Sequence, residues 1–199
     1  MTRPRLVVMA GGTASGKSTL ARALAESLGD RLLLLEHDRY YIDHPDPDTA
    51  DFDHPDSLET GLLVENLDAL LAGRPARLPV YEFARHRRAS APEVVAPRPI
   101  VLVEGILTLH HGPLADRADL RVFVDAPADV RLARRFVRDL ARRGRTPESV
   151  RDRYLAMVRP AHERFVEPSR DRADLVLAGD GPFDVALTRL QVAIEALRS

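Results

Sequence analysis

Residues 10–20 read AGGTASGKSTL. Gly11, Gly16, Lys17 and Ser18 satisfy the pattern G-x-x-x-x-G-K-[ST], in which backbone N–H groups and a helix N-terminus surround phosphate oxygens. The apolar run LVVMA precedes the loop, and STLARALAESL, which has helical periodicity, follows it. The stretch therefore predicts a strand, a phosphate-binding loop and a helix in succession.

Lys17 is the only lysine of the chain, whose lysines and arginines together number 29. A lysine places a compact charge on a flexible stem, whereas the guanidinium of arginine is a planar fork. We therefore predict that the ammonium group of Lys17 contacts the β- and γ-phosphates of a nucleotide. The alternative is a chance glycine-rich turn, which the flanking segments and the single lysine argue against. The residues expected to bind the phosphates are Gly11, Gly12, Thr13, Ala14, Ser15, Gly16, Lys17, Ser18 and Thr19.

The composition of the 199 residues is that of a globular protein, with 45% hydrophobic and 30% charged residues. A formal net charge of -1 does not indicate nucleic-acid binding. The chain has no cysteine, which excludes disulfides, cysteine-bound zinc, iron–sulfur clusters and a thiol nucleophile. No apolar run reaches the length of a signal peptide or a membrane span. We expect a cytoplasmic protein without a nucleic-acid or membrane partner.

Short apolar runs alternate with segments of helical periodicity along the chain. The runs lie at 6–10, 32–36, 100–104, 120–124 and 174–178. The helical segments lie at 18–28, 57–72, 127–143, 147–165 and 183–198. Continuous hydrophobicity suits parallel strands that are buried on both faces. We predict an α/β three-layer sandwich with a mainly parallel five-stranded sheet, formed by a single domain over 1–199. Within it, 75–99 is predicted as a β-hairpin insertion and 127–165 as a helical lid.

Acidic residues stand where three of the apolar runs end. They are Asp38, Glu104 and Asp125. Because the carboxyl ends of parallel strands meet at one edge of a sheet, these side chains are expected near the phosphate loop. Carboxylates beside a Mg²⁺-nucleotide favour catalysis over a binding switch, and the chain lacks the N-K-x-D and LSGGQ elements of GTPases and transporter ATPases. For Asp125, a strand that simply ends in a polar residue is an equal alternative.

The segment 127–145 is rich in arginine. Four arginines share one helical face, Arg131, Arg135, Arg138 and Arg142, and four apolar residues form the opposite face, Ala133, Phe136, Val137 and Leu140. A solvated basic face is one interpretation. The glycine of RRGR, flanked by arginines between two helices, favours a mobile lid that brings positive charge to a transferring phosphoryl group.

Seven motifs in one order resemble the uridine/cytidine kinases, the P-loop kinases of pyrimidine salvage. They are GGTASGKST, HDRYY, FDHPD, YEFARHRR, VEGIL, FVDAPADVRLARRFVRDLARRGR and RPAHERFVEPSRDRADLVL. The resemblance spans residues 7–177 and implies ATP or GTP as phosphate donor, Mg²⁺, and a pyrimidine nucleoside whose 5′-hydroxyl is phosphorylated. It also implies a homo-oligomer, commonly a tetramer.

The resemblance implies roles for the residues that match the motifs of the family. Asp38 would activate the 5′-hydroxyl, and Asp53 would bind the ribose hydroxyls. Lys17 would act with the helix arginines Arg135 and Arg138 on the phosphoryl group. Magnesium would be held by Ser18, Asp38 and Glu104. The nucleotide would also contact Arg143, and the nucleoside site would comprise Tyr41, Phe52, Asp53, Tyr81, Phe83, His86, Arg135, Arg145 and Arg153. The family usually has glutamine where this chain has Arg153.

Two other functions stay open at this point. One is a related P-loop kinase that acts on pantothenate or a sugar phosphate, against which FDHPD argues. The other is a nucleotide-binding regulatory protein without turnover, for which Arg153 is the best support.

Overall fold

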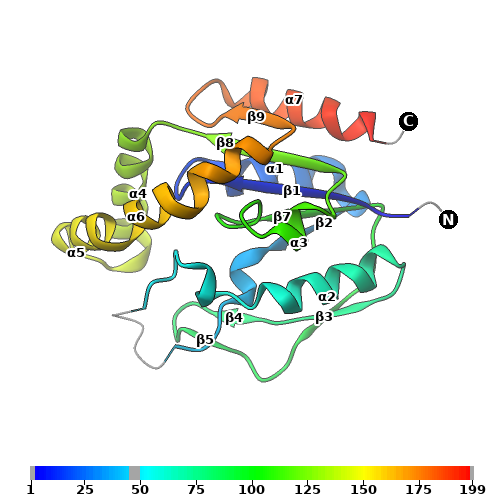
Figure 1. The fold of residues 1–199 in the computed structure, drawn as a ribbon, viewed down its shortest axis with the longest axis horizontal. Helices are drawn as coiled ribbons and strands as arrows, with labels where there is room; N and C mark the ends of the chain where they lie inside the picture. Colours follow the sequence, from blue (N-terminus) through cyan, green and yellow to red (C-terminus); the bar gives the residue numbers. More distant parts are fainter. Residues whose placement is uncertain (1–2, 45–49, 198–199) are drawn as a thin grey trace.

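The computed structural model describes residues 3–44 and 50–197, apart from the side chains of Arg142 and Arg143. Five parallel strands form one sheet in the order β2-β7-β1-β8-β9 (Figure 1). They are β2 (Leu32–Glu36), β7 (Ile100–Glu104), β1 (Arg5–Gly11), β8 (Leu120–Asp125) and β9 (Leu175–Ala178). The predicted α/β class with a five-stranded parallel sheet is therefore confirmed.

Helices cover both faces of the sheet, which explains why its strands are apolar without alternation. The helices α1 (Lys17–Leu28) and α7 (Phe183–Ala196) pack together on the face to which Val7 and Met9 point. On the other face, Leu6 and Val8 join the cluster of α2 (Thr60–Leu71), and α3 (Gly112–Ala115) completes that layer. β1 is thus buried on both sides, and its end, the phosphate loop, is held by the whole core.

A helical arm stands over one end of the sheet, at the left of Figure 1. It consists of α4 (Ala128–Arg143), α5 (Pro147–Arg153) and α6 (Arg159–Ala161), with π-helical turns at Tyr154–Val158 and His162–Val166. The sequence predicts one helix over 147–165, and the two π-helical turns are a departure from it. Pro160, which lacks an N–H donor, lies between them. Among residues 3–44 and 50–197, no helix is long and apolar enough to span a bilayer.

A long hairpin, residues 76–95, projects beneath α2 (Figure 1). Its base is formed by β3 (Ala76–Leu78) and β6 (Glu93–Val95), and its tip by β4 (Tyr81–Glu82) and β5 (Arg87–Arg88), with antiparallel pairing in both. The tip lies beside the 3₁₀ turn His37–Tyr40 that follows β2. The hairpin therefore brings residues 81–88 next to the carboxyl edge of the main sheet.

Candidate active site

The phosphate loop has the backbone that phosphate binding requires. Gly16 has a φ of 102°, a left-handed conformation that a residue with a side chain rarely adopts. A Cβ on Gly12 would lie 2.6 Å from Nη1 of Arg131, so a larger residue there would force the buried side chain of Arg131 to move. Lys17 begins α1 and is 8% exposed. The loop therefore directs its N–H groups, a helix N-terminus and one buried ammonium at the same space.

One cleft of about 1250 Å³ lies in front of the loop. It brings together most of the residues that the sequence predicts for a site: Thr13, Ala14, Gly16, Lys17, Ser18, Thr19, Asp38, Tyr41, Phe52, Asp53, Tyr81, Phe83, His86, Glu104, Arg135, Arg138, Arg145 and Arg153. Gly11, Gly12 and Ser15 belong to the loop but do not line the cleft, and the side chain of Arg143 lies outside the described part of the chain.

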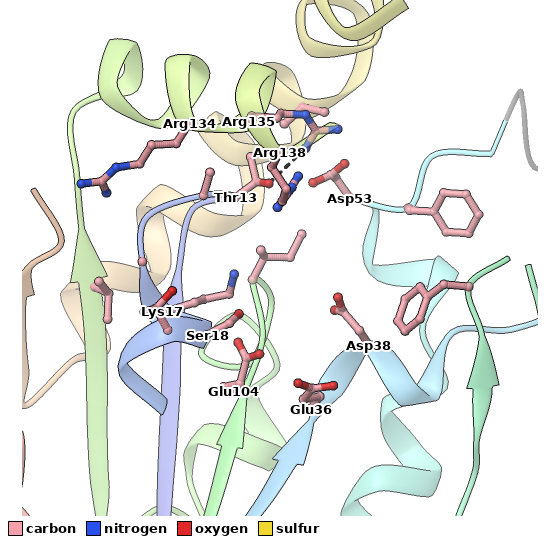
Figure 2. A pocket seen from close by; sticks show the side chains of 18 of the residues that line it. Thr13, Lys17, Ser18, Glu36, Asp38, Asp53, Glu104, Arg134, Arg135 and Arg138 are labelled. Carbon is pink, nitrogen blue, oxygen red and sulfur yellow. Dashed lines mark hydrogen bonds between the residues drawn. The ribbon is translucent and has the colours of Figure 1, made fainter. Parts of the chain in front are cut away.

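Carboxylates from two neighbouring strands gather beside Lys17 and Ser18 (Figure 2). Glu36 and Glu104 end β2 and β7 in matching register, and Asp38 follows in the 3₁₀ turn. Glu104 is 6% exposed, and burial raises its pKa, with Lys17 opposing the shift and Asp38 adding to it. Its Oε2 has no hydrogen-bond partner among the described residues. A buried carboxylate oxygen of this kind fits a cation.

A magnesium site here would need further ligands in addition to the carboxylates. Among the described residues, no three His, Cys, Asp or Glu side chains are close enough to hold a metal alone. Mg²⁺ commonly binds one or two carboxylates and completes its octahedron with phosphate and water oxygens. Glu104, Asp38 and the Ser18 hydroxyl therefore fit a Mg²⁺ that arrives with a nucleotide.

On α4, the arginines Arg131 and Arg135 point into the protein, and Val137 on the opposite face points outward. Arg131 and Arg135 are each 6% exposed, whereas Val137 is 71% exposed. Arg135 donates from Nη1 to Oγ1 of Thr13 in the phosphate loop, at 3.0 Å. A solvated basic face is therefore wrong for Arg131 and Arg135, because the phosphate loop and the carboxylate of Asp139 surround that side of the helix.

Asp53 lies across the cleft from the phosphate loop, close to Arg135 and Arg138 (Figure 2). Burial raises the pKa of its carboxyl group, and the nearby charges of Arg135, Lys17 and Arg138 oppose the shift. Asp51 adds to the rise through like charge. Asp53 is thus a part-buried acceptor that faces the cationic side of the cleft.

Aromatic rings form the opposite wall. The centroids of Tyr41 and Phe52 are 5.2 Å apart, and the ring of His86 stacks on Phe52 at 5.3 Å. Tyr81 lies 5.5 Å from Tyr41 and 5.2 Å from Phe83, which is 50% exposed. The hairpin tip and the segment around Phe52 thus build one continuous wall that suits a flat heterocycle.

The cleft also contains residues that the sequence did not single out. Glu36 lines it and pairs with Arg22 at 3.2 Å. Arg134 lines it and donates to the Gly179 carbonyl at 2.8 Å. The sequence could have indicated Glu36 as a site residue, because Glu36 is the last residue of a predicted strand. Asp125, by contrast, does not line the cleft and pairs with Arg170 at 3.1 Å.

Comparison with known proteins places this site in a family. The Phosphoribulokinase / Uridine kinase family matches residues 6–185. A uridine kinase of Chloroflexus aurantiacus is 44% identical over 205 residues, with 98% of each chain covered. A uridine kinase of Chloroflexus aggregans is 45% identical over 199 residues, with 97% of this chain and 95% of the relative covered.

The solved structure of phosphoribulokinase from Rhodobacter spheroides shares the fold, with a TM-score of 0.69 at 16% identity over 91% of this chain and 74% of that one. The phosphate loop, the carboxylates after β2 and β7 and the arginines of α4 thus occur in a chain whose full length is matched by uridine kinases. The chain belongs to the phosphoribulokinase/uridine kinase family.

Proposed function

We propose that the protein transfers the γ-phosphoryl group of ATP, or of GTP, to the 5′-hydroxyl of uridine or cytidine, giving the nucleoside monophosphate. The observation that carries this is the cleft that Asp38 lines together with the phosphate loop and the aromatic side chains. The uridine kinases that match the whole chain support the same reaction.

On the donor side, the protein offers positive charge where the triphosphate would lie. Lys17 and the loop amides would bind the β- and γ-phosphates, and Arg135 and Arg138 reach the loop from α4. Ser18, Glu104 and Asp38 would hold a Mg²⁺, which would supply positive charge beside the phosphates. These groups act on the phosphoryl group as its charge spreads over the equatorial oxygens.

On the acceptor side, Asp38 would accept the proton of the 5′-hydroxyl as the new O–P bond forms and the bond from the γ-phosphorus to the bridging oxygen breaks. ADP leaves with that oxygen. Asp53 would accept hydrogen bonds from the ribose hydroxyls, and Tyr41 lies beside Asp38. The base would stand against Phe52, Tyr81, Phe83 and His86, and Arg145 and Arg153 also line the cleft. Positioning of both reactants in one cleft supplies much of the rate.

Two further features belong to this proposal, the domain organisation and the oligomeric state. The chain acts as one domain, in which residues 75–99 form the nucleoside side and the helices within 127–165 form a lid over the phosphates. The active form is a homo-oligomer, which sedimentation of the purified protein would test. A monomer with full turnover would remove the oligomer from the proposal.

The deciding experiment is ADP release with MgATP and a panel of acceptors. The panel contains uridine, cytidine, adenosine, guanosine, pantothenate, ribulose 5-phosphate and no acceptor. Turnover confined to uridine and cytidine is expected. Turnover with a sugar phosphate or pantothenate instead would assign another kinase activity, and nucleotide binding without turnover on any acceptor would indicate a regulatory protein.

A further inference from the structure

We propose that Arg39 and Arg88 form a reciprocal clamp that fixes the hairpin to the turn carrying Asp38, and that both are positioning residues for the acceptor. The inference rests on the proposed function, because it concerns the nucleoside side of the same cleft. Neither side chain lines the cleft. Each belongs to one of the two segments and contacts the other.

Arg88 reaches from β5 to the turn after β2. Its Nη2 donates to the Tyr40 carbonyl at 2.8 Å, and its Nε donates to the Tyr41 carbonyl at 2.9 Å. Its Nη1 pairs with the carboxylate of Glu59, whose own backbone N–H donates to the same Tyr40 carbonyl at 2.9 Å. One guanidinium therefore joins the hairpin, the turn and the start of α2 through a closed ring of hydrogen bonds.

Arg39 makes the opposite connection. It directly follows Asp38, and its Nε donates to the Pro79 carbonyl between β3 and β4 at 3.1 Å. Its Nη2 pairs with the carboxylate of Glu93 in β6. The side chains of Arg39 and Arg88 are only 22% and 24% exposed, so both are partly shielded from water. The two segments thus hold each other by one arginine from each.

The two arginines fix the distance between the hairpin tip and the turn that carries Asp38, and the acceptor must span this distance. The hairpin tip carries Phe83 and His86, which would contact the base, and the turn carries Asp38, which would contact the 5′-hydroxyl; all three side chains line the cleft. A nucleoside reacts only if its base and its 5′-hydroxyl reach their partners together. A clamp between tip and turn therefore selects acceptors by length and orients the hydroxyl toward Asp38.

A lysine would keep the charge of either arginine but lose the clamp. The planar guanidinium presents several N–H groups in fixed directions, whereas an ammonium is a point donor on a flexible stem. Arg39→Lys and Arg88→Lys therefore remove the bridging geometry at constant charge. Arg117→Lys is the matched control, because Arg117 binds Asp68 at 2.8 and 3.1 Å and the Pro113 carbonyl at 2.6 Å, outside the cleft.

The test is steady-state kinetics of the single variants, the double variant and the control with uridine and MgATP. We expect each single variant to lower kcat/KM for uridine by about 10- to 100-fold, with KM for MgATP unchanged, because misplacement of about 1 Å costs about that much. The loss of kcat/KM in the double variant should be no larger than in the more impaired single variant, because both arginines hold the same connection. The clamp would be contradicted if the fold-losses in kcat/KM of the two single variants multiplied in the double variant. An equal loss in Arg117→Lys would contradict it as well.

Hydrogen exchange separates failure of the clamp from failure of the proposed function. In a clamp, Arg39→Lys and Arg88→Lys each speed amide exchange in both segments, at Ile42, which donates to the Ser57 carbonyl at 3.0 Å, and at Ala89, which donates to the Val80 carbonyl at 2.8 Å. Faster exchange only in the segment that carries the substitution would overturn the clamp. A wild-type protein that is inert toward uridine and cytidine would overturn the proposed function and leave this exchange test intact.

Discussion

The Nη1 atom of Arg135 lies 3.0 Å from Oγ1 of Thr13 and donates a hydrogen bond to it, so α4 contacts the phosphate loop directly. Behind this contact, the fully buried carboxylate of Asp139 lies 3.4 Å from Nε of Arg135 and 2.8 Å from Nε of Arg138. Asp139 therefore orients two guanidinium groups toward the space in front of the loop.

Substitution of that buried carboxylate should affect both stability and nucleotide use. Asp139→Asn removes a fully buried counter-charge of two arginines, which we expect to lower the free energy of unfolding by about 3 kcal/mol. It should also raise KM for MgATP, because the arginines no longer keep their orientation. Urea unfolding and steady-state kinetics would measure the two effects. Asp152→Asn, which breaks an exposed pair with Arg151, is the control and should leave the free energy of unfolding close to that of the wild type. Equal effects of the two substitutions would contradict the role of Asp139.

Asp38→Asn should separate catalysis from nucleotide binding. The amide keeps the size of the side chain but cannot accept the proton of the 5′-hydroxyl, so kcat is expected to fall by about 10²- to 10⁴-fold. Binding of ATP should be kept, because the phosphate loop supplies most of its contacts. Equilibrium binding and turnover would be compared with those of Asp56→Asn, which changes a carboxylate that is 92% exposed. Turnover close to that of the wild type would remove Asp38 from the mechanism.

Asp53 should give opposite effects on stability and on nucleoside binding. Because burial raises its pKa, the fold favours the protonated carboxyl, and the free energy of unfolding falls as the pH rises from the ordinary aspartate value through the raised one. Asp53→Asn removes the free-energy cost of keeping a charged carboxylate in this place, so the variant should be more stable than the wild type at neutral pH. It should also raise KM for uridine by about 10-fold or more, because a charged acceptor for the ribose is lost. Urea unfolding across the pH range and uridine kinetics test both statements, and an unchanged uridine KM would refute the ribose role.

His37 should make the fold sensitive to acid. It is 1% exposed, its Nε2 lies 3.0 Å from Oγ1 of Thr60, and burial lowers its pKa from 6.5 to about 3, with His111 adding to the shift. The folded state therefore holds a neutral imidazole, and its stabilising contribution is lost as the pH falls from about 6.5 toward 3. His37→Gln should flatten that part of the pH profile in urea unfolding. A profile as steep as that of the wild type would assign the acid sensitivity to other groups.

The sequence predicted the sheet and the phosphate loop because both depend on local patterns. Five apolar runs without alternation indicated buried parallel strands, and Lys17 occupied the lysine position of the G-x-x-x-x-G-K-[ST] motif. The side of α4 that is buried could not be read in the same way. Arg135 is buried because Thr13 lies beside it, 122 positions away along the chain, and periodicity shows a helical face without showing its partner. The same holds for Arg134 and the Gly179 carbonyl, 45 positions apart. The contacts of Arg39 and Arg88 likewise needed the hairpin to be placed first.

Arg153 offers a test of the nucleoside side at the position where the family usually has glutamine. Its Nη2 donates to the Ala50 carbonyl at 3.0 Å and so ties α5 to the segment that leads into Phe52 and Asp53. Glutamine is too short for the same reach, and the loss of one such hydrogen bond corresponds to about 1 kcal/mol. Arg153→Gln should therefore raise KM for uridine and cytidine by about fivefold, with KM for MgATP unchanged.

The control for this change is Arg151→Gln on the same helix, because the side chain of Arg151 is 60% exposed and pairs with its neighbour Asp152. Nucleoside kinetics of the two variants would be compared at saturating MgATP. If Arg153→Gln leaves the KM of both nucleosides unchanged, the contact with Ala50 does not position Asp53. If it raises KM for MgATP instead, Arg153 acts on the donor side of the cleft, with the arginines of α4.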